Sequence, residues 1–171
     1  ERYLNVYGEK DLRAQMNQFF HRTYTHPVDG TTLDMKMLCN WYWYDETAIL
    51  ETGKGTKDWN FYRYAETLLS AAEAIAQSSG VNAEAAGYLA QVKARANMEG
   101  KDVSTIASEL QRLGKQAFIE ECWKERLREF PLEMKIWDDC VRTGKFPQIS
   151  ATNKGEVQFV DLIGAKNGSG A

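Results

Sequence analysis

Residues 125–145 read ERLREFPLEMKIWDDCVRTGK, a charge-rich segment with a single proline, Pro131. Because a proline ring clashes with a continuing helix, the segment predicts a helix that ends before Pro131 and a second, short helix over 132–141. The charged residues then edge a buried stripe, so the segment is expected to build architecture and to take no part in catalysis. The stripe has the three- and four-residue spacing of one helix face and consists of Leu127, Phe130, Met134, Trp137 and Val141.

The sequence before this segment predicts helices that stack in pairs. Apolar and alanine residues follow a helical period there, and Asn82 and Ser104 are suited to cap helix starts. Short turns between the helices imply antiparallel neighbours. The predicted fold class is therefore all-α, with TPR-like stacked helix pairs and long loops, although no regular repeat recurs. The predicted helices run from Phe61 to the stop at Ser78-Ser79-Gly80, from 83 to 97, from 104 to 113 and from 115 to 129.

The remaining sequence has fewer periodic segments. Before the helices we expect a short helix over 11–20, a turn at 27–30 and a polar loop at 53–58. After them, residues 156–162 partly alternate and suggest a strand, for which the sequence identifies no partner. The chain is predicted to divide into a loop-rich aromatic region, a helical scaffold and a truncated C-terminal extension, at 1–60, 61–147 and 148–171.

Composition indicates a globular protein and argues against several classes of function. With 43% hydrophobic residues and a net charge of −3 over 171 residues, the chain fits one domain with a real core, and no basic patch points to nucleic acid. No apolar run reaches the roughly 18 residues that a membrane helix needs. Three cysteines without a C-x-x-C pair predict no disulfide framework. Since the chain starts at Glu1 without a leader, we expect a fragment of a longer protein.

Residues with catalytic or metal-binding chemistry are present but poorly spaced for it. His21, His26 and Cys39 fit neither a helical pair of ligands nor a zinc loop, so no metal site and no cofactor are predicted. Asp138 and Asp139 would project about 100° apart on a helix, which favours solvated or arginine-paired carboxylates over an acid–base pair. Hydrolase motifs such as G-x-S-x-G and H-E-x-x-H are absent. The sequence therefore predicts no enzyme, with a hydrolase as a distant alternative.

Acidic and basic residues flank the predicted helix faces. A carboxylate that is buried between helices needs a donor of matched charge, and the arginine fork supplies one. We therefore expect semi-buried pairs between packed helices, drawn from Glu66, Glu73, Arg95, Arg126, Arg128 and Arg142.

Aromatic residues are concentrated in two short clusters, 41–44 (WYWY) and 59–62 (WNFY). In a strand, the two tryptophans of the first cluster would point to one face and the two tyrosines to the other, so that one face packs on the helices while the other stays exposed. Indole and phenol rings stack well on the apolar faces of sugars or on peptide side chains. Burial of any single ring in the core is the alternative. The candidate ligand-binding residues are Trp41, Trp43, Tyr44 and Trp59.

Four segments together resemble the SusD/RagB family in their order and spacing. Asp11-Leu-Arg13, before them, is similar to an Asp-x-Arg that the family often has. The chain departs from the family at Glu133–Ile136 (EMKI), where a Gly and an Arg are usual, which puts the local packing in question. The four segments are Arg63–Ala74 (RYAETLLSAAEA), Val92–Ala96 (VKARA), Glu125–Glu129 (ERLRE) and Trp137–Lys145.

The resemblance implies the C-terminal half of a larger SusD-like fold, in a lipoprotein anchored to the outer membrane at the cell surface of Bacteroidetes-type bacteria. It implies that the protein captures starch-like or other glycans without turnover and passes them to a TonB-dependent, SusC-like porin. Ligand positions vary between members of the family, so the aromatic candidates rest on their own chemistry. Two alternatives stay open: the same fold binding a peptide or another nutrient, and a helical-repeat module that docks a protein partner.

Overall fold

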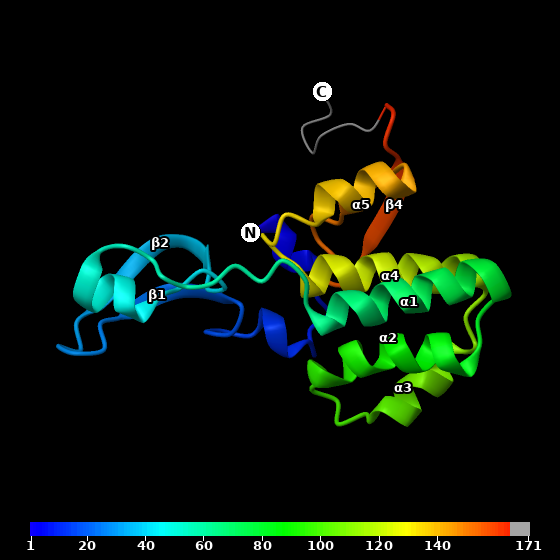
Figure 1. The fold of residues 1–171 in the computed structure, drawn as a ribbon, viewed down its shortest axis with the longest axis horizontal. Helices are drawn as coiled ribbons and strands as arrows, with labels where there is room; N and C mark the ends of the chain where they lie inside the picture. Colours follow the sequence, from blue (N-terminus) through cyan, green and yellow to red (C-terminus); the bar gives the residue numbers. More distant parts are fainter. Residues whose placement is uncertain (165–171) are drawn as a thin grey trace.

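The computed structural model describes residues 1–164, which form a body of helices with two antiparallel hairpins (Figure 1). The helices are α1 (Tyr64–Ser79), α2 (Ala83–Arg95), α3 (Val103–Leu110), α4 (Lys115–Glu129) and α5 (Ile136–Thr143). The strands are β1 (Phe20–Thr25), β2 (Thr32–Asn40), β3 (Lys145–Ile149) and β4 (Val157–Asp161). Three short helical turns complete the described chain: η1 (Arg2–Val6), η2 (Leu12–Ala14) and the π-helical η3 (Ala48–Thr52). The fold is mainly helical and includes strands, so the expectation of a purely all-α fold is corrected.

Four helices enclose the main hydrophobic core. α1 packs against α2 and α4, and α2 packs in turn against α3. Small residues such as Ala72 on α1 and Ala86 on α2 let the helices approach closely, while Leu69, Leu89 and Phe118 fill the space between them and are fully buried. The predicted pairing of neighbouring helices is therefore confirmed for these elements.

Two helices, α2 and α3, begin with a side-chain cap, and one of the two predicted caps is corrected. The Asn82 side chain accepts a hydrogen bond from the Ala85 amide at 2.9 Å, as predicted for the cap of α2. The cap of α3 is Asp102, which accepts from the Thr105 amide at 2.7 Å, and not Ser104. The Ser104 hydroxyl instead donates to the Asp102 carboxylate at 2.9 Å. An ionised carboxylate at this position also interacts favourably with the helix dipole, which the serine hydroxyl does not.

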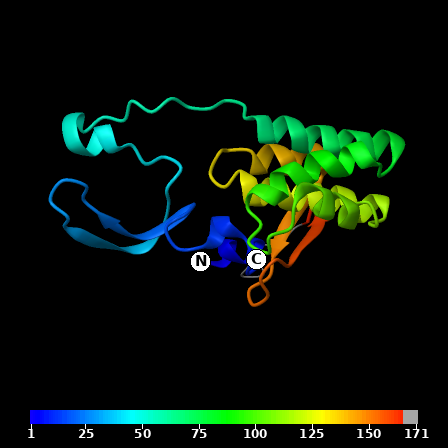
Figure 2. The same cartoon turned by 90° about the horizontal axis from the view of Figure 1, so that it is seen from below.

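The predicted helix over 11–20 is wrong. Only the single turn η2 forms there, and the chain then enters β1, which pairs with β2 from Phe20 opposite Asn40 to Thr25 opposite Thr32. The turn predicted at 27–30 joins these two strands, and its His26 amide donates to the Thr31 carbonyl. Figures 1 and 2 show this hairpin and η3 standing to one side of the helices. The extended segment 53–63 connects them to α1.

The second hairpin follows α5 directly. The strand expected within 156–162 is confirmed as β4, and its partner is β3, which the sequence did not reveal because Pro147 interrupts its pattern. The part of the expected C-terminal extension beyond Gly164 lies outside the described residues. Val157 of β4 joins a second hydrophobic cluster with Val6, Tyr7 and Phe20, and Leu127 of α4 completes it. Helix α4 therefore contributes to both hydrophobic clusters.

The predicted buried stripe holds before Pro131 and fails after it. Leu127 and Phe130 are buried, whereas Met134 is 68% exposed, Trp137 is 65% exposed and Val141 is also exposed. The cause is the connection between α4 and α5, where Leu132 and Met134 take positive φ values of 60° and 61°. This turn resets the helical phase, because α5 begins only at Ile136 and buries Cys140 in place of the expected residues. No helix within residues 1–164 is long and apolar enough to cross a membrane.

Candidate ligand-binding site

A fully buried carboxylate, that of Glu129, joins four segments of the chain. Glu129 is the last residue of α4, and its Oε2 accepts from Arg13 Nη1 in η2 at 3.0 Å. Its Oε1 accepts from Arg63 Nη1, at the cap of α1, at 2.8 Å. Arg95, the last residue of α2, reaches both carboxylate oxygens through Nη2. The ends of three helices and the N-terminal segment therefore meet at one negative charge.

Glu133 extends this network toward the loop between α4 and α5. Its carboxylate accepts from Arg63 in the two-pronged manner that suits an arginine fork, with distances of 2.9 Å from Nε and 2.8 Å from Nη2. The same guanidinium lies 4.9 Å from the centre of the Phe130 ring, and Arg126 lies 5.3 Å from it. Arg63 is thereby held between charges and an aromatic face, with every guanidinium nitrogen engaged.

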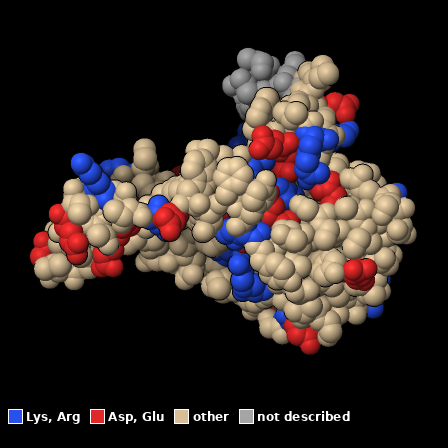
Figure 3. Space-filling view, in the orientation of Figure 1, with Lys and Arg blue, Asp and Glu red and all other residues tan. Residues whose placement is uncertain are grey.

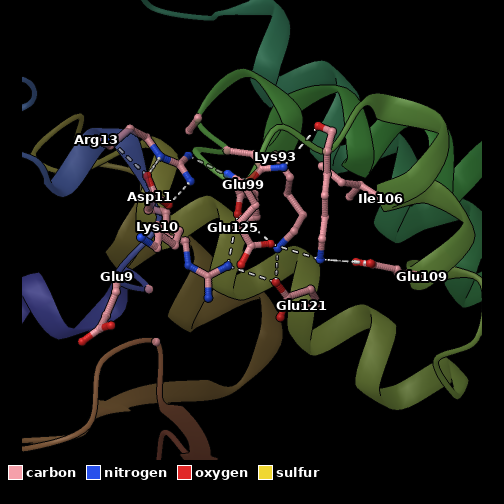
Figure 4. A pocket seen from close by; sticks show the side chains of 16 residues that line it. Glu9, Lys10, Asp11, Arg13, Lys93, Glu99, Ile106, Glu109, Glu121 and Glu125 are labelled. Carbon is pink, nitrogen blue, oxygen red and sulfur yellow. Dashed lines mark hydrogen bonds and ion pairs between the residues drawn. The ribbon is translucent and has the colours of Figure 1, made fainter.

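A second charged cluster surrounds Glu125, one helical turn before Glu129, and lines a cavity of about 460 Å³ (Figure 4). Arg13 Nη1 lies 2.8 Å from Glu125 Oε1, Arg128 Nη1 lies 3.2 Å from Oε2, and Lys93 Nζ lies 3.8 Å from Oε2. Burial alone would raise the pKa of Glu125, but the charges of Arg13, Lys93 and Arg128 together lower this pKa to about 2. Glu121 shares Lys93 and Arg128. The charges of this cavity therefore largely satisfy one another.

Other predicted pairs between helices are confirmed, except for Arg128, whose carboxylate partners Glu121 and Glu125 lie on its own helix α4. Arg142 of α5 donates from Nη1 and Nη2 to the two carboxylate oxygens of Glu73 on α1, each at 2.7 Å. Burial raises the pKa of Glu73, but its hydrogen bond with Arg142 contributes to a net lowering. Asp139 accepts from Arg126 at 2.7 Å and from Arg142 at 2.9 Å, as expected for an arginine-paired carboxylate, while its neighbour Asp138 is exposed. Arg126 also lies 3.4 Å from Glu66.

A cleft of about 390 Å³ opens between the helical body and the aromatic region. Its floor is the Glu129 network, and its walls include Leu12, Phe19 and Tyr42. A further cavity of about 290 Å³ adjoins it, since Arg63 and Arg95 line both. Tyr64 and Gln91 are among the other residues that line the second cavity. We call the two cavities together the arginine groove.

The four candidate aromatic residues fall into two clusters. Trp41 stacks on Tyr44, with ring centroids 4.6 Å apart and planes 13° apart, and on His21 with centroids 4.0 Å apart. Trp43 meets Trp59 edge to face at 5.8 Å, and these two rings are 39% and 53% exposed. The expected alternation in a strand is wrong, because β2 ends at Asn40 and the four residues follow it in a turn. That turn brings Trp41 and Tyr44 together.

The exposed tryptophan pair continues the wall of the arginine groove. Tyr42 lines the groove and packs edge to face against Trp43 at 4.8 Å. The Trp43 indole nitrogen also donates to the Leu132 carbonyl at 3.4 Å, which ties the aromatic region to the loop after α4. Sequence reasoning singled out neither Tyr42 nor Phe19 as ligand residues. The aromatic cluster pointed to Tyr42, but its orientation depends on a turn that no periodic pattern records.

The histidines and Cys39 are placed in the first hairpin. His21 and Cys39 are partners in the β1–β2 ladder, while His26 accepts hydrogen bonds from the Val28 and Asp29 amides in the hairpin turn. Within residues 1–164, no group of three or more His, Cys, Asp or Glu side chains has an arrangement that could hold a metal ion.

Comparisons with known proteins agree with this architecture. A model of the SusD family matches residues 7–164, so the chain belongs to the SusD family. A solved structure of a SusD superfamily protein from Parabacteroides distasonis ATCC 8503 is similar over 100% of this chain, with 27% sequence identity and a TM-score of 0.81. The chain spans 35% of the length of that protein. A search of curated proteins found no match to the sequence.

The Glu129 network predicts that removing the charge of this one side chain strongly lowers the stability of the protein. In Glu129→Gln, the side chain keeps its size but leaves three arginines around a neutral amide. We expect the free energy of unfolding to fall by about 3 kcal/mol or more, because removing one partner strands buried charge. Urea denaturation measures this. The exposed Glu51→Gln should stay within about 0.5 kcal/mol of the parent, and an equally small loss in Glu129→Gln would refute the role of the charge.

The lowered pKa of Glu125 predicts a pH dependence of stability. Because its pKa is about 2 in the folded protein against an ordinary 4.5, deprotonated Glu125 favours folding above pH 4.5 and this contribution is lost as the pH falls toward 2. Denaturation midpoints measured across this range should fall less steeply for Glu125→Gln than for the parent. Glu51→Gln should keep the steep profile. Equal slopes in the Glu125 variant and the parent would contradict the assignment.

Proposed function

We propose that the protein is a binding protein of the cell surface that captures oligosaccharides for uptake and does not turn them over. The carrying observation is the exposed Trp43–Trp59 pair, which extends the Tyr42 wall of the arginine groove. Indole rings offer flat apolar faces to the C–H faces of sugars, and polar groups of a cleft fix the orientation of the hydroxyls. Membership of the SusD family supports the same reading.

Binding in this site requires little rearrangement of the scaffold. The floor of the groove is the Glu129 network, whose side chains are held by several charged hydrogen bonds each. Side chains that are already ordered lose less conformational entropy when a ligand binds, so more of the contact energy remains as affinity. The groove and the tryptophan pair together suit a ligand of several sugar units.

The state of the carboxylates supports binding over hydrolysis. Glycoside hydrolysis needs one carboxyl group that can donate a proton and one that is free to attack or to activate water. Glu125, Glu129 and Asp139 are instead each held by at least two cationic side chains. Such pairing occupies the carboxylate oxygens that either catalytic role would need.

We further propose that a TonB-dependent, SusC-like porin receives the ligand and that a lipid anchor holds the whole protein at the outer membrane. An exposed apolar face supports contact with a protein partner. It comprises Trp137 and Val141 of α5 and the preceding Leu132 and Met134. Single exposed apolar residues are common on protein surfaces, whereas a contiguous apolar patch marks an interaction site, and these four exposed residues lie within one ten-residue stretch, 132–141.

The glycan proposal predicts loss of affinity when the tryptophan pair is truncated. Trp43→Ala and Trp59→Ala should each weaken oligosaccharide binding by roughly tenfold, since removal of a stacked aromatic anchor typically costs more than 1 kcal/mol. Isothermal titration against a panel of neutral and acidic oligosaccharides measures this. Trp137→Ala is the matched control, because Trp137 is also exposed but lines neither cavity of the groove. Binding of peptides alone would favour the peptide alternative.

The porin proposal predicts variants that lose the porin and keep the affinity for oligosaccharides. Trp137→Glu combined with Val141→Glu places charge on the exposed apolar face of α5, so co-purification with the TonB-dependent porin should be lost while oligosaccharide affinity is unchanged. Trp43→Ala serves as the control, which should keep the porin and bind the oligosaccharide more weakly. Retention of the porin by the double variant would show that this face of α5 is not the contact.

A further inference from the structure

Arg95 differs from the other arginines of the groove in having donors to spare. Its Nη2 contacts Glu129, whereas its Nε and Nη1 have no hydrogen-bond partner among residues 1–164. The side chain is 55% exposed. By contrast, all three guanidinium nitrogens of Arg63 and of Arg13 are engaged with carboxylates or a carbonyl. Arg95 therefore presents unengaged N–H groups on Nε and Nη1 to a ligand that enters the groove.

The charge that a ligand meets in the groove is positive. The negative charges of the network, Glu129 and Glu133, are buried beneath the arginines, and the exposed part of the network is the guanidinium of Arg95. Figure 3 shows basic side chains gathered where the narrower part of the molecule meets the helical body. A cation that faces a partly dehydrated groove attracts an anion more strongly than the same cation on an open surface.

The position of Arg95 is central in the groove. Arg95 and Arg63 line both cavities, of about 390 and 290 Å³, so a ligand that occupies both must pass them. Phe19 and Tyr42 are part of the lining of the first cavity, and the exposed Tyr64 is part of that of the second. The groove thus places an exposed guanidinium with unengaged donors between two cavities with aromatic walls, which is the pattern that an acidic oligosaccharide complements.

We infer that the arginine groove selects acidic oligosaccharides, in which one sugar carries a carboxylate or sulfate. The anionic group accepts a charged hydrogen bond from Nη1 or from Nε of Arg95, two donors that point in different directions. The neighbouring sugar units lie in the two cavities, against Tyr42 on one side and Tyr64 on the other. This inference rests on the proposed glycan binding and names the class of glycan.

The test compares ligands that differ only in charge. Trigalacturonate and its methyl ester are titrated calorimetrically into the protein, as are a sulfated galactose oligosaccharide and its desulfated form. The acidic member of a pair should bind about tenfold or more tightly, the range expected of a hydrogen-bonded charge pair. Which pair shows the difference distinguishes carboxylate from sulfate. Binding of that acidic member should weaken as sodium chloride is raised, while binding of its neutral counterpart stays constant.

Variants then test whether Arg95 causes the preference for acidic ligands. Arg95→Gln should lose most of the preference for the acidic ligand, so that the acidic and neutral members of a pair bind with similar affinity, while Arg95→Lys should retain part of the preference. Arg112→Gln is the matched control, because Arg112 is exposed after α3 and has no ion pair among the described residues. If Arg95→Gln is too unstable to titrate, the salt dependence and the ligand pairs on the parent protein still decide.

Failure of the selectivity can be distinguished from failure of the proposed glycan binding. Equal affinity for the acidic and neutral members of both pairs overturns the selectivity while leaving glycan binding intact. A preference for acidic ligands that persists fully in Arg95→Gln also overturns the assignment to Arg95. Absence of binding to every oligosaccharide, acidic or neutral, overturns the proposed function itself.

Discussion

The structure depends on one buried carboxylate, that of Glu129. Taking a carboxylate out of water costs several kcal/mol even after relaxation, and only well-placed partners offset that cost. Here the partners are Arg13, Arg63 and Arg95, which stand at the N-terminal segment, at the start of α1 and at the end of α2. Each segment must reach its position for the charge to be satisfied, so the ion network specifies how the ends of the helices meet as well as contributing to stability.

The location of this network also determines where a ligand can bind. Hydrophobic contacts hold the middle of the helices together, and they are indifferent to the exact placement of the ends. At the helix ends, the arginines around Glu129 hold the segments at fixed positions, and the groove opens above these arginines. Tyr42 then reaches the groove from the aromatic region, and its neighbour Trp43 is anchored to the Leu132 carbonyl. A rigid charged floor and an aromatic wall thus come from parts of the chain far apart in sequence.

The sequence predicted what depends on local patterns. The spacing of apolar residues in α1, α2 and α4 and the cap at Asn82 follow from helix geometry, and the structure has them. The residue types of the arginine–glutamate pairs were also predictable, because a buried carboxylate demands such a donor. The convergence of three arginines on Glu129 was not, since it depends on how helices separated by tens of residues pack together. Only the resemblance to the SusD/RagB family extended the prediction beyond the helices to the larger fold.

Two of the errors have a common physical cause, which is a change of backbone direction that composition does not record. Positive φ at Leu132 and Met134 changes the direction of the chain after Pro131. Apolar residues whose spacing looks continuous in the sequence are therefore buried before this turn and exposed after it. The turn after Asn40 likewise stacks Trp41 on Tyr44, where an extended strand would have separated them. Both errors fall beside the proposed site, at Trp43 and the loop it contacts. Backbone that departs from regular periodicity concentrates where side chains are aimed at a function, because regular elements present their residues only at fixed intervals.

Arg95 shows how structural and binding roles can share one side chain. Through Nη2 it completes the shell around Glu129, and this contact holds the guanidinium plane in place before any ligand arrives. The long side chain is therefore already ordered in the folded protein and loses little conformational entropy when a ligand binds. Its two remaining donor groups can then contribute more to the affinity. A freely mobile lysine at the same position would carry the charge without this orientation, since its ammonium has no planar edge to present. Selectivity for an anionic ligand then follows from the same interaction that fixes the helix ends.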